Sequence, residues 1–224
     1  EGARIVDDPA LDDPGASFDR WFADEVSIEI VRSPGLAAGL ELLGWEPESV
    51  THVLITHPHG DHYGGVARER DGALQTRFPN ARHFIGRADW MDNPARAEPD
   101  SELERRLGPV ERSGLLELVD QEREVAPGVA LLPAPGESPG HQVVRLDSGG
   151  ERLYALGDLI HHGCEVEHLD WSPQQSDVAT LAASRARLFP QLAREEALAV
   201  SAHERFPPWR RVVVAGDGFR WEEA

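Results

Sequence analysis

One stretch of this sequence decides how the remainder is interpreted: residues 53–62 read VLITHPHGDH. Residues 50–56 are apolar enough to form a buried strand, and that strand leads directly into four side chains able to bind metal. In extended backbone His57 and His59 point to the same side, and the proline between them favours that conformation. The next residue, a glycine, permits a sharp turn that brings in Asp61 and His62 from a second direction. The sequence therefore predicts a metal site on a loop at the end of a strand.

The density of histidines argues against a purely structural role. A lone histidine is usually a surface group or a hydrogen-bonded core residue, but here three of the ten histidines fall within six positions beside an aspartate. Structural zinc sites usually complete their ligand set with cysteines. Imidazole and carboxylate groups without thiolate are typical of catalytic zinc, manganese or iron centres with open positions. The pattern therefore indicates a catalytic metal site.

The acidic composition limits the classes of partner. Forty Asp and Glu residues against 22 Lys and Arg give a formal charge of −18, which disfavours nucleic acid as a partner. No apolar run approaches the ~20 residues that cross a bilayer, so we expect no membrane partner. Cys164 is the only cysteine, which excludes an intramolecular disulfide and fits a reducing compartment. Because the acidic start also lacks a signal-peptide pattern, we expect a cytoplasmic protein.

Strand and helix patterns are mixed along the whole chain without an obvious linker. This mixture predicts an α/β or α+β fold and a single domain over residues 1–224. We expect helices at residues 36–43 and 101–107, and a third helix that Ser176 caps. The expected strands are residues 26–31, 50–56, 81–85, 129–132, 142–146, 152–156, 197–200, 212–215 and 219–221.

The motif HPHGDH, preceded by VLIT and followed by Tyr63-Gly64-Gly65, resembles the HxHxDH signature of the metallo-β-lactamase superfamily. Three later motifs resemble those of that family and follow in its order: Pro139-Gly140-His141, Leu156-Gly157-Asp158 and Ser201-Ala202-His203. The resemblance implies the family's four-layer αββα sandwich. It covers residues 36–221.

The resemblance implies a centre of two divalent ions. Zn²⁺ is the expected ion, with Mn²⁺, Fe²⁺ and Co²⁺ as alternatives. A metal-bridging hydroxide would attack a carbonyl or phosphoryl group, with Asp61 passing a proton to the leaving group. Asp61 and Asp158 are thus the expected catalytic residues. One metal would be bound by His57, His59 and His141, the other by Asp61, His62 and His203, and both by Asp158.

Two features depart from the family pattern. Only about fifty residues precede His57, and the usual Asp-x-Gly after an early strand is not recognisable. Either the N-terminal sheet is shortened or residues are absent from this sequence. Glu137 stands where the common PGHTPGH motif has its first histidine, a residue that usually does not contact the metal. We therefore expect metal binding to survive this change.

The end of the chain indicates a branch of the family. The sequence HERFPP at residues 203–208 resembles the His-x-x-Phe-Pro loop of many lactonases, arylesterases and organophosphate hydrolases. This implies a small-molecule lactone or ester as substrate, with a phosphotriester as a further option. We expect the wall of the substrate pocket to comprise His161, His162, Trp171 and Phe206. For the stretch after Asp158, residues 161–171, an exposed polar loop is an equal alternative.

Several alternatives remain open at this point. A thioester hydrolase or a β-lactamase would use the same site. A redox enzyme on this scaffold, similar to iron-dependent persulfide dioxygenases, would consume oxygen, and a non-catalytic module would bind metal without turnover. The oligomeric state is also open, with a homodimer among the alternatives.

Overall fold

The computed structural model describes residues 2–10, 35–172, 176–205 and 207–224. The chain divides into two compact units, one of Glu1–Phe84 with Asn93–Glu117 and the other of Ile85–Asp92 with Leu118–Ala224. The single domain over residues 1–224 stays a prediction. The strand predicted at residues 26–31 lies outside the described residues, so the extent of the N-terminal sheet is also still a prediction.

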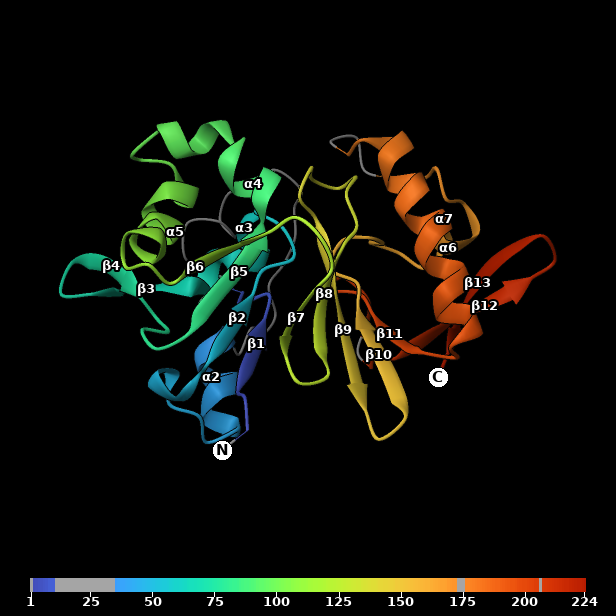
Figure 1. Cartoon of the computed structure of the whole chain (residues 1–224), viewed down its shortest axis with the longest axis horizontal. Coiled ribbons are helices and arrows are strands. Elements are labelled where there is room, and N and C mark those ends of the chain that lie inside the picture. The colour runs from blue at the N-terminus through green and yellow to red at the C-terminus, as the bar shows by residue number, and fades with distance from the viewer. Residues whose placement is uncertain (1, 11–34, 173–175, 206) are drawn as a thin grey trace. The chain divides into compact units, whose positions relative to one another are not determined.

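The first unit is built on short parallel strands (Figure 1). Strand β2 (His52–Leu54) pairs in parallel with β1 (Ile5–Asp7) on one side and β5 (Arg82–Gly86) on the other. With β6 (Leu116–Val119) they form a sheet of order β1-β2-β5-β6. Val53 and Leu54 of β2 and the following Ile55 are fully buried, which explains why the sequence before His57 is a continuous hydrophobic run.

Helices and a hairpin complete the first unit. Helix α5 begins where predicted, with the Ser101 hydroxyl accepting a hydrogen bond from the Glu104 amide at 3.1 Å, but it continues through Pro109 to Arg112. The elements are α2 (Gly35–Leu42), α3 (Gly60–Tyr63), α5 (Glu102–Arg112), β3 (Ala67–Arg70), β4 (Ala73–Thr76) and the 3₁₀ turns η1 (Pro47–Ser49), η2 (Gly64–Val66) and η3 (Pro94–Ala97).

The second unit contains a seven-stranded mixed sheet of order β13-β12-β11-β10-β9-β8-β7. Its neighbouring strands are antiparallel except β10 and β11, which are parallel; β10 ends three residues before Asp158 and β11 ends three residues before His203. The helices are α4 (Arg87–Met91), α6 (Cys164–Glu167) and α7 (Val178–Arg194). The strands are β7 (Arg123–Ala126), β8 (Val129–Pro133), β9 (Gln142–Ser148), β10 (Glu151–Ala155), β11 (Leu198–Val200), β12 (Arg210–Ala215) and β13 (Gly218–Glu223).

Helix α7 buries one apolar face in the core of the second unit, where it packs against β12 (Figure 1). Its residues Leu181, Leu188 and Leu192 are fully buried, at a spacing that places them on one side of a helix. The cap of this helix differs from the prediction. Asp177 accepts from the Thr180 amide at 3.2 Å, whereas Ser176 donates its hydroxyl hydrogen to Glu137. Two adjacent capping residues made the sequence ambiguous by one position.

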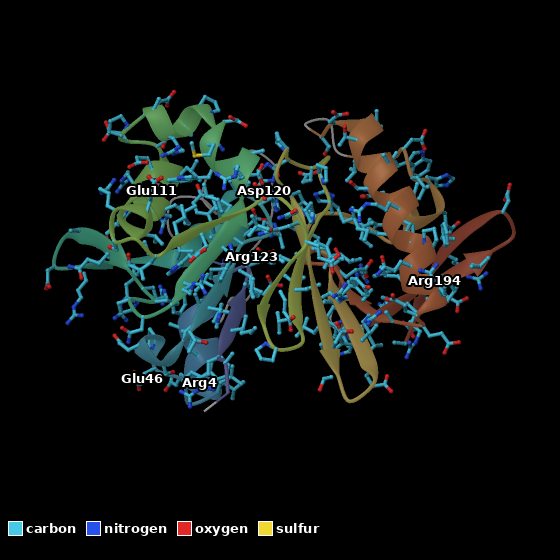
Figure 2. The ribbon with its side chains drawn as sticks, in the orientation of Figure 1. Arg4, Glu46, Glu111, Asp120, Arg123 and Arg194 are labelled. Atoms are coloured by element: carbon cyan, nitrogen blue, oxygen red, sulfur yellow. The ribbon has the colours of Figure 1, made fainter. Side chains whose placement is uncertain are left out.

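Much of the surface charge lies in ion pairs. Glu111 accepts from Arg96 at 3.0 Å in the first unit, and Asp120 accepts from Arg87 at 3.0 Å in the second (acidic partners labelled in Figure 2). Such exposed pairs contribute little to stability, roughly 0–1 kcal/mol each. Among the described residues, every helix is too short or too polar to span a bilayer.

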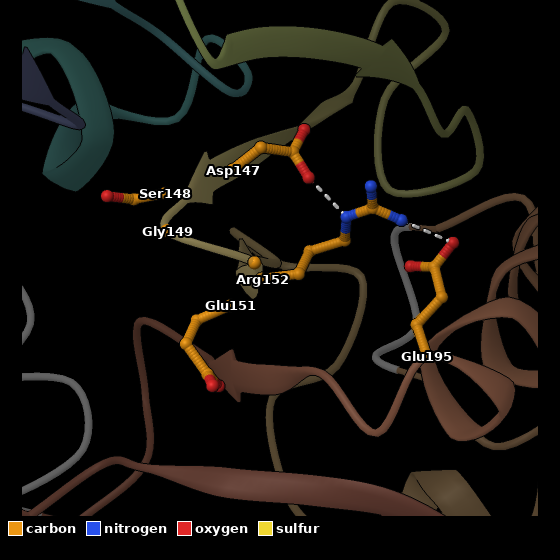
Figure 3. A pocket seen from close by; sticks show the side chains of 7 residues that line it. Asp147, Ser148, Gly149, Glu151, Arg152 and Glu195 are labelled. Atoms are coloured by element: carbon orange, nitrogen blue, oxygen red, sulfur yellow. Dashed lines mark hydrogen bonds and ion pairs between the residues drawn. The ribbon is translucent and has the colours of Figure 1, made fainter.

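The β9–β10 hairpin carries a denser charge cluster at its turn. Arg152 pairs with Asp147 and, through Nη1, with Glu195 at 2.7 Å (Figure 3). These side chains border a hollow of about 390 Å³. Because none of the predicted metal ligands lines it, we treat it as a feature of the hairpin surface.

His83 in β5 gives the fold a defined response to acid. Its ring is fully buried, with Nδ1 3.0 Å from the Ala81 carbonyl oxygen. Burial lowers the pKa of His83 from 6.5 to about 4 despite that hydrogen bond. Between these two values the unfolded chain binds a proton that the folded chain excludes. The contribution of His83 to the free energy of unfolding is therefore fully present above about pH 6.5. It falls by up to about 3 kcal/mol as the pH drops to 4.

We expect His83→Gln to flatten this acid response. The variant should be less stable than the original chain at pH 7, because glutamine does not fill the space of the buried imidazole ring. It should lose less stability than the original chain between pH 6.5 and 4. Urea unfolding of both proteins at pH 7, 6 and 5 measures the two slopes. Equal slopes would show that His83 is not the responsible group.

Candidate metal centre

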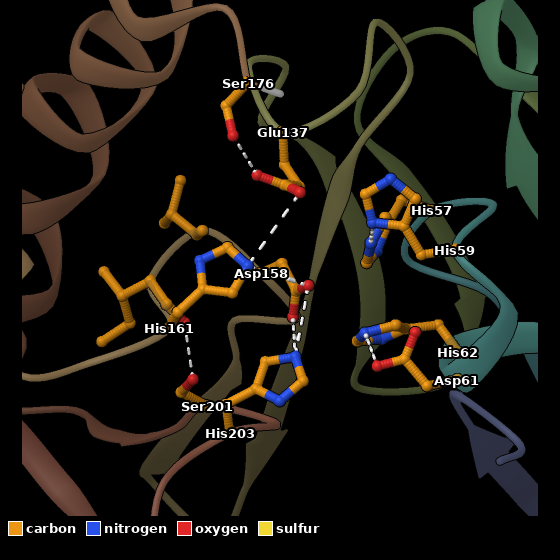
Figure 4. Close-up of polar contacts among 12 residues, drawn as sticks. His57, His59, Asp61, His62, Glu137, Asp158, His161, Ser176, Ser201 and His203 are labelled. Atoms are coloured by element: carbon orange, nitrogen blue, oxygen red, sulfur yellow. Dashed lines mark hydrogen bonds and ion pairs between the residues drawn. The ribbon is translucent and has the colours of Figure 1, made fainter. Parts of the chain in front are cut away.

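Four predicted ligands of the first unit lie together on the loop after β2. His59 has extended backbone (φ −82°, ψ 144°) and caps the single-turn helix α3, which carries Asp61 and His62. The rings of His57 and His59 are 4.4 Å apart and those of His57 and His62 4.1 Å apart, between centroids. His57 and His62 are buried, while the Asp61 side chain is 43% exposed. Their role as ligands stays a prediction, but the loop brings all four together (Figure 4).

His57 and His59 direct ring nitrogens at each other. Nε2 of His57 lies 2.8 Å from Nδ1 of His59. Two imidazole nitrogens bound at about 2.1 Å to one zinc ion would lie roughly 3.0–3.4 Å apart, so little movement separates the observed pair from a chelating one. In the same loop, Nε2 of His62 lies 3.5 Å from Oδ2 of Asp61.

Asp8, at the end of β1, orients this loop and was not anticipated from the sequence. Its carboxylate accepts from the Thr56 amide at 2.7 Å and from the Thr56 hydroxyl at 2.8 Å, and it lies 2.8 Å from His62 Nδ1. The Thr56 oxygen is 3.0 Å from His57 Nδ1. These contacts assign the hydrogen to Nδ1 in both rings and leave the lone pair on Nε2 for a metal.

Removing the Asp8 charge should weaken metal binding. Asp8→Asn suits the backbone, because Asp8 has φ +43° and asparagine tolerates that region. We expect its zinc affinity to fall about tenfold or more, measured by competition with a chromophoric chelator. Asp71→Asn is the matched control, since Asp71 has φ +54° and is 88% exposed in the turn after β3. Unchanged affinity in Asp8→Asn would contradict an orienting role.

In the second unit, His141 is fixed from both sides of its ring. It is fully buried just before β9, with Nδ1 3.0 Å from the Ala134 carbonyl oxygen. That contact leaves the lone pair on Nε2, which accepts from the Asp158 amide at 3.1 Å. The loop before it is held by Asp89, a buried residue that the sequence did not single out. Its carboxylate accepts from Ser138 at 2.6 Å and from the Gly140 amide at 2.7 Å.

Asp158 is the centre of a second group of donors. Its carboxylate is 4% exposed, with Oδ1 3.2 Å from His203 Nε2 and Oδ2 3.2 Å from His161 Nε2. The ligand atoms of Asp158, His161 and His203 all lie within 4.8 Å of one another. The two imidazoles are stacked, with centroids 5.3 Å apart, and Figure 4 shows both directed at Asp158.

Carboxylates surround His161 on several sides. Oε1 of Glu137 lies 3.9 Å from His161 Nε2, and Oε2 of Glu165 lies 3.9 Å from Nδ1. Burial opposes the charged form, but Asp158, Glu165 and Glu137 together raise the pKa of His161 to about 10. The residue that replaces the usual histidine of the family motif, Glu137, is thus a buried acid beside this cluster.

The other predicted pocket residues are placed differently. His162 is exposed, with Nδ1 3.2 Å from Cys164 Sγ. Trp171 is also exposed and stacks on His168, with centroids 3.9 Å apart. Phe206 lies outside the described residues. Of the three that the structure describes, His161 is the one in contact with a predicted ligand.

The donors present fit divalent transition metals. Each unit supplies imidazole nitrogens and carboxylate oxygens without thiolate, and the outer nitrogens of His57, His62 and His141 are held by oxygen acceptors. Such partners fix ring orientation in metal sites. Among these side chains, the donor chemistry suits zinc, manganese or iron.

A comparison of the sequence with family models decides the classification. The model described as the metallo-beta-lactamase superfamily matches residues 10–203. The chain belongs to this superfamily. The predicted fold class is confirmed as the metallo-β-lactamase α/β fold with mixed sheets.

Similar proteins of this superfamily include hydrolases. A probable metallo-hydrolase of Mycobacterium tuberculosis is 26% identical over 196 residues, which are 81% of this chain and 59% of that protein. An N-acyl homoserine lactonase of Bacillus cereus is 28% identical over 140 residues, 62% of this chain and 50% of that protein. The chain thus spans 59% of the length of the first relative and 50% of that of the second. The structure of AidC, a dizinc quorum-quenching lactonase in complex with a product, matches with a TM-score of 0.72 at 26% identity, covering 88% of this chain and 71% of AidC.

Proposed function

We propose that this chain is a dinuclear metal-dependent hydrolase that opens a lactone or cleaves an ester. The observation that carries the proposal is the complete set of seven donors in the order that the family uses. His57, His59 and His141 would hold one ion, Asp61, His62 and His203 the other, and Asp158 both. The similarity to lactonases supports the choice of a lactone or ester.

The protein's own groups have distinct tasks in this proposal. When bound, the two ions supply an activated water and polarise the carbonyl of the substrate. Asp8 and the Ala134 carbonyl keep the ligand rings in the tautomers that metal binding requires. Asp61 is partly exposed, and we expect its carboxylate to pass a proton to the leaving alkoxide. We expect His161, beside Asp158, to border the substrate.

A substrate panel tests the proposal. Purified protein loaded with zinc, manganese or iron would be assayed on an N-acyl homoserine lactone, a simple lactone, an aryl ester, a thioester, a phosphotriester and a β-lactam, each with and without chelator. We expect chelator-sensitive turnover of lactone or ester above that of the other classes. Turnover confined to thioester, phosphotriester or β-lactam would replace the substrate class. Oxygen consumption with a persulfide substrate and no hydrolysis would overturn the proposal.

A further inference from the structure

A fully buried arginine fastens the segment that follows Asp158. Arg185 belongs to α7, and its side chain is 0% exposed. Nε donates to the Leu159 carbonyl at 2.7 Å, and Nη1 donates to the carbonyls of Leu169, at 3.0 Å, and Trp171. One guanidinium thus satisfies carbonyls at both ends of residues 159–171, a segment whose regular structure is the single turn α6.

The counter-charge of Arg185 comes from the middle of the same segment. Nη2 of Arg185 pairs with Glu165, whose side chain is 9% exposed. Burial lowers the pKa of Arg185, while the Glu165 charge opposes that shift. Removing two charges from water costs about as much as their attraction returns, so a buried pair adds little net stability. The pair instead selects one arrangement of the segment, and that arrangement fixes the position of Glu165.

Glu165 connects the pair to the donor cluster. Its Oε2 accepts from the backbone amide of His161 at 3.2 Å. The ring Nδ1 of His161 lies 3.9 Å from the same oxygen, beyond hydrogen-bond range, so the ring senses the charge without a direct bond. On its other side, Nε2 of His161 lies 3.2 Å from Asp158. Polar contacts therefore join Arg185 to Glu165, Glu165 to the backbone amide of His161, and the His161 ring to Asp158.

We propose that Arg185 and Glu165 are positioning residues that shape residues 159–171 and thereby fix the His161 imidazole against Asp158. The inference rests on the proposed function, because the orientation of His161 affects turnover only if Asp158 belongs to the catalytic centre. Neither Arg185 nor Glu165 touches the substrate in this account. Lysine cannot replace Arg185 fully, since one ammonium lacks the fork that reaches three carbonyls and a carboxylate together.

The test compares Glu165→Gln, Arg185→Lys and Arg185→Gln with Leu192→Ala in zinc-loaded protein. Leu192 is fully buried two turns further along α7, so its truncation lowers the melting temperature without removing a contact to Glu165. Four quantities are measured: melting temperature, zinc per chain, kcat with KM, and the ¹⁵N shifts of the His161 ring, assigned with His161→Gln. The ring shifts report the protonation, tautomer and hydrogen bonding of the imidazole, which change when its contacts change, and they need no substrate.

We expect Glu165→Gln and Arg185→Gln to keep their zinc, to lose at least tenfold in kcat, and to shift the His161 ring signals. Arg185→Lys should recover part of both losses. Leu192→Ala should lower the melting temperature and leave kcat and the ring signals unchanged. Unshifted ring signals in Glu165→Gln and Arg185→Gln would overturn the positioning role. If the original chain hydrolyses no lactone or ester, the proposed function fails, and the ring signals still decide whether Arg185 and Glu165 orient His161.

Discussion

Asp158→Asn is expected to abolish hydrolysis while leaving the protein folded. The amide has nearly the shape of the carboxylate but carries no charge, so it cannot neutralise two cations at once. Loss of a group at the centre of the proposed site should lower kcat/KM on the order of 10³-fold, which corresponds to about 4 kcal/mol of transition-state stabilisation. Metal content should fall from about two ions per chain to about one. Kinetics on the best panel substrate and elemental analysis of the same sample measure both effects.

The matched control for this exchange is Asp217→Asn. Asp217 is exposed in the turn between β12 and β13, in the same unit as Asp158, and makes the identical change from carboxylate to amide. It should keep full activity and both ions. An Asp158→Asn protein that retains more than about a tenth of the original kcat/KM would contradict a central role for this carboxylate.

Gly136→Ala is expected to cause a large loss of stability in the second unit. Gly136 has φ +140°, a region that side chains rarely adopt, and an added Cβ would lie 2.3 Å from the Cα of Leu181. That atom belongs to the backbone of α7, so the clash is relieved only by moving the helix or the loop that carries Glu137. Backbone strain and overpacking together should cost about 4 kcal/mol or more. Urea unfolding at pH 7 measures the change.

Gly149→Ala separates the two causes. Gly149 also has a positive φ, +60°, but an added Cβ there would meet nothing within 4 Å. This variant should therefore lose only the conformational part, about 1 kcal/mol. Equal losses in Gly136→Ala and Gly149→Ala would mean that close packing against α7 is not what requires a glycine at residue 136.

The sequence predicted best where chemistry and local pattern coincide. Buried Val53, Leu54 and Ile55 lead directly into the histidine loop, as expected from one hydrophobic run followed by metal-binding residues. The hairpin predicted from residues 142–146 and 152–156 is present as β9 and β10, because two glycines mark its turn. These features depend on residues that are close together in the sequence, so they can be predicted from one sequence.

Features that depend on distant partners were missed. Asp8 directly follows the short strand β1, which lacks the family's Asp-x-Gly, and its contact with His62 joins residues 54 positions apart. The sequence signal for this residue was limited to two aspartates, Asp7 and Asp8, that follow the apolar pair Ile5-Val6. In the sequence, Arg185 is one charged residue of an amphipathic helix. No neighbouring residue indicates that it forms an ion pair with Glu165, twenty positions earlier in the chain. Strands β6 and β7 were also not predicted, because their charged residues interrupt the apolar pattern.

The most direct test of the two-metal hydrolase is a metal titration of turnover. Protein stripped with chelator would receive zinc in steps from zero to four equivalents, and lactone hydrolysis would be followed at each step beside bound zinc. We predict negligible activity without zinc and a rise that levels off at about two bound ions per chain. Full activity in the stripped protein, or two tightly bound ions with no hydrolysis of any lactone or ester, would contradict the central claim.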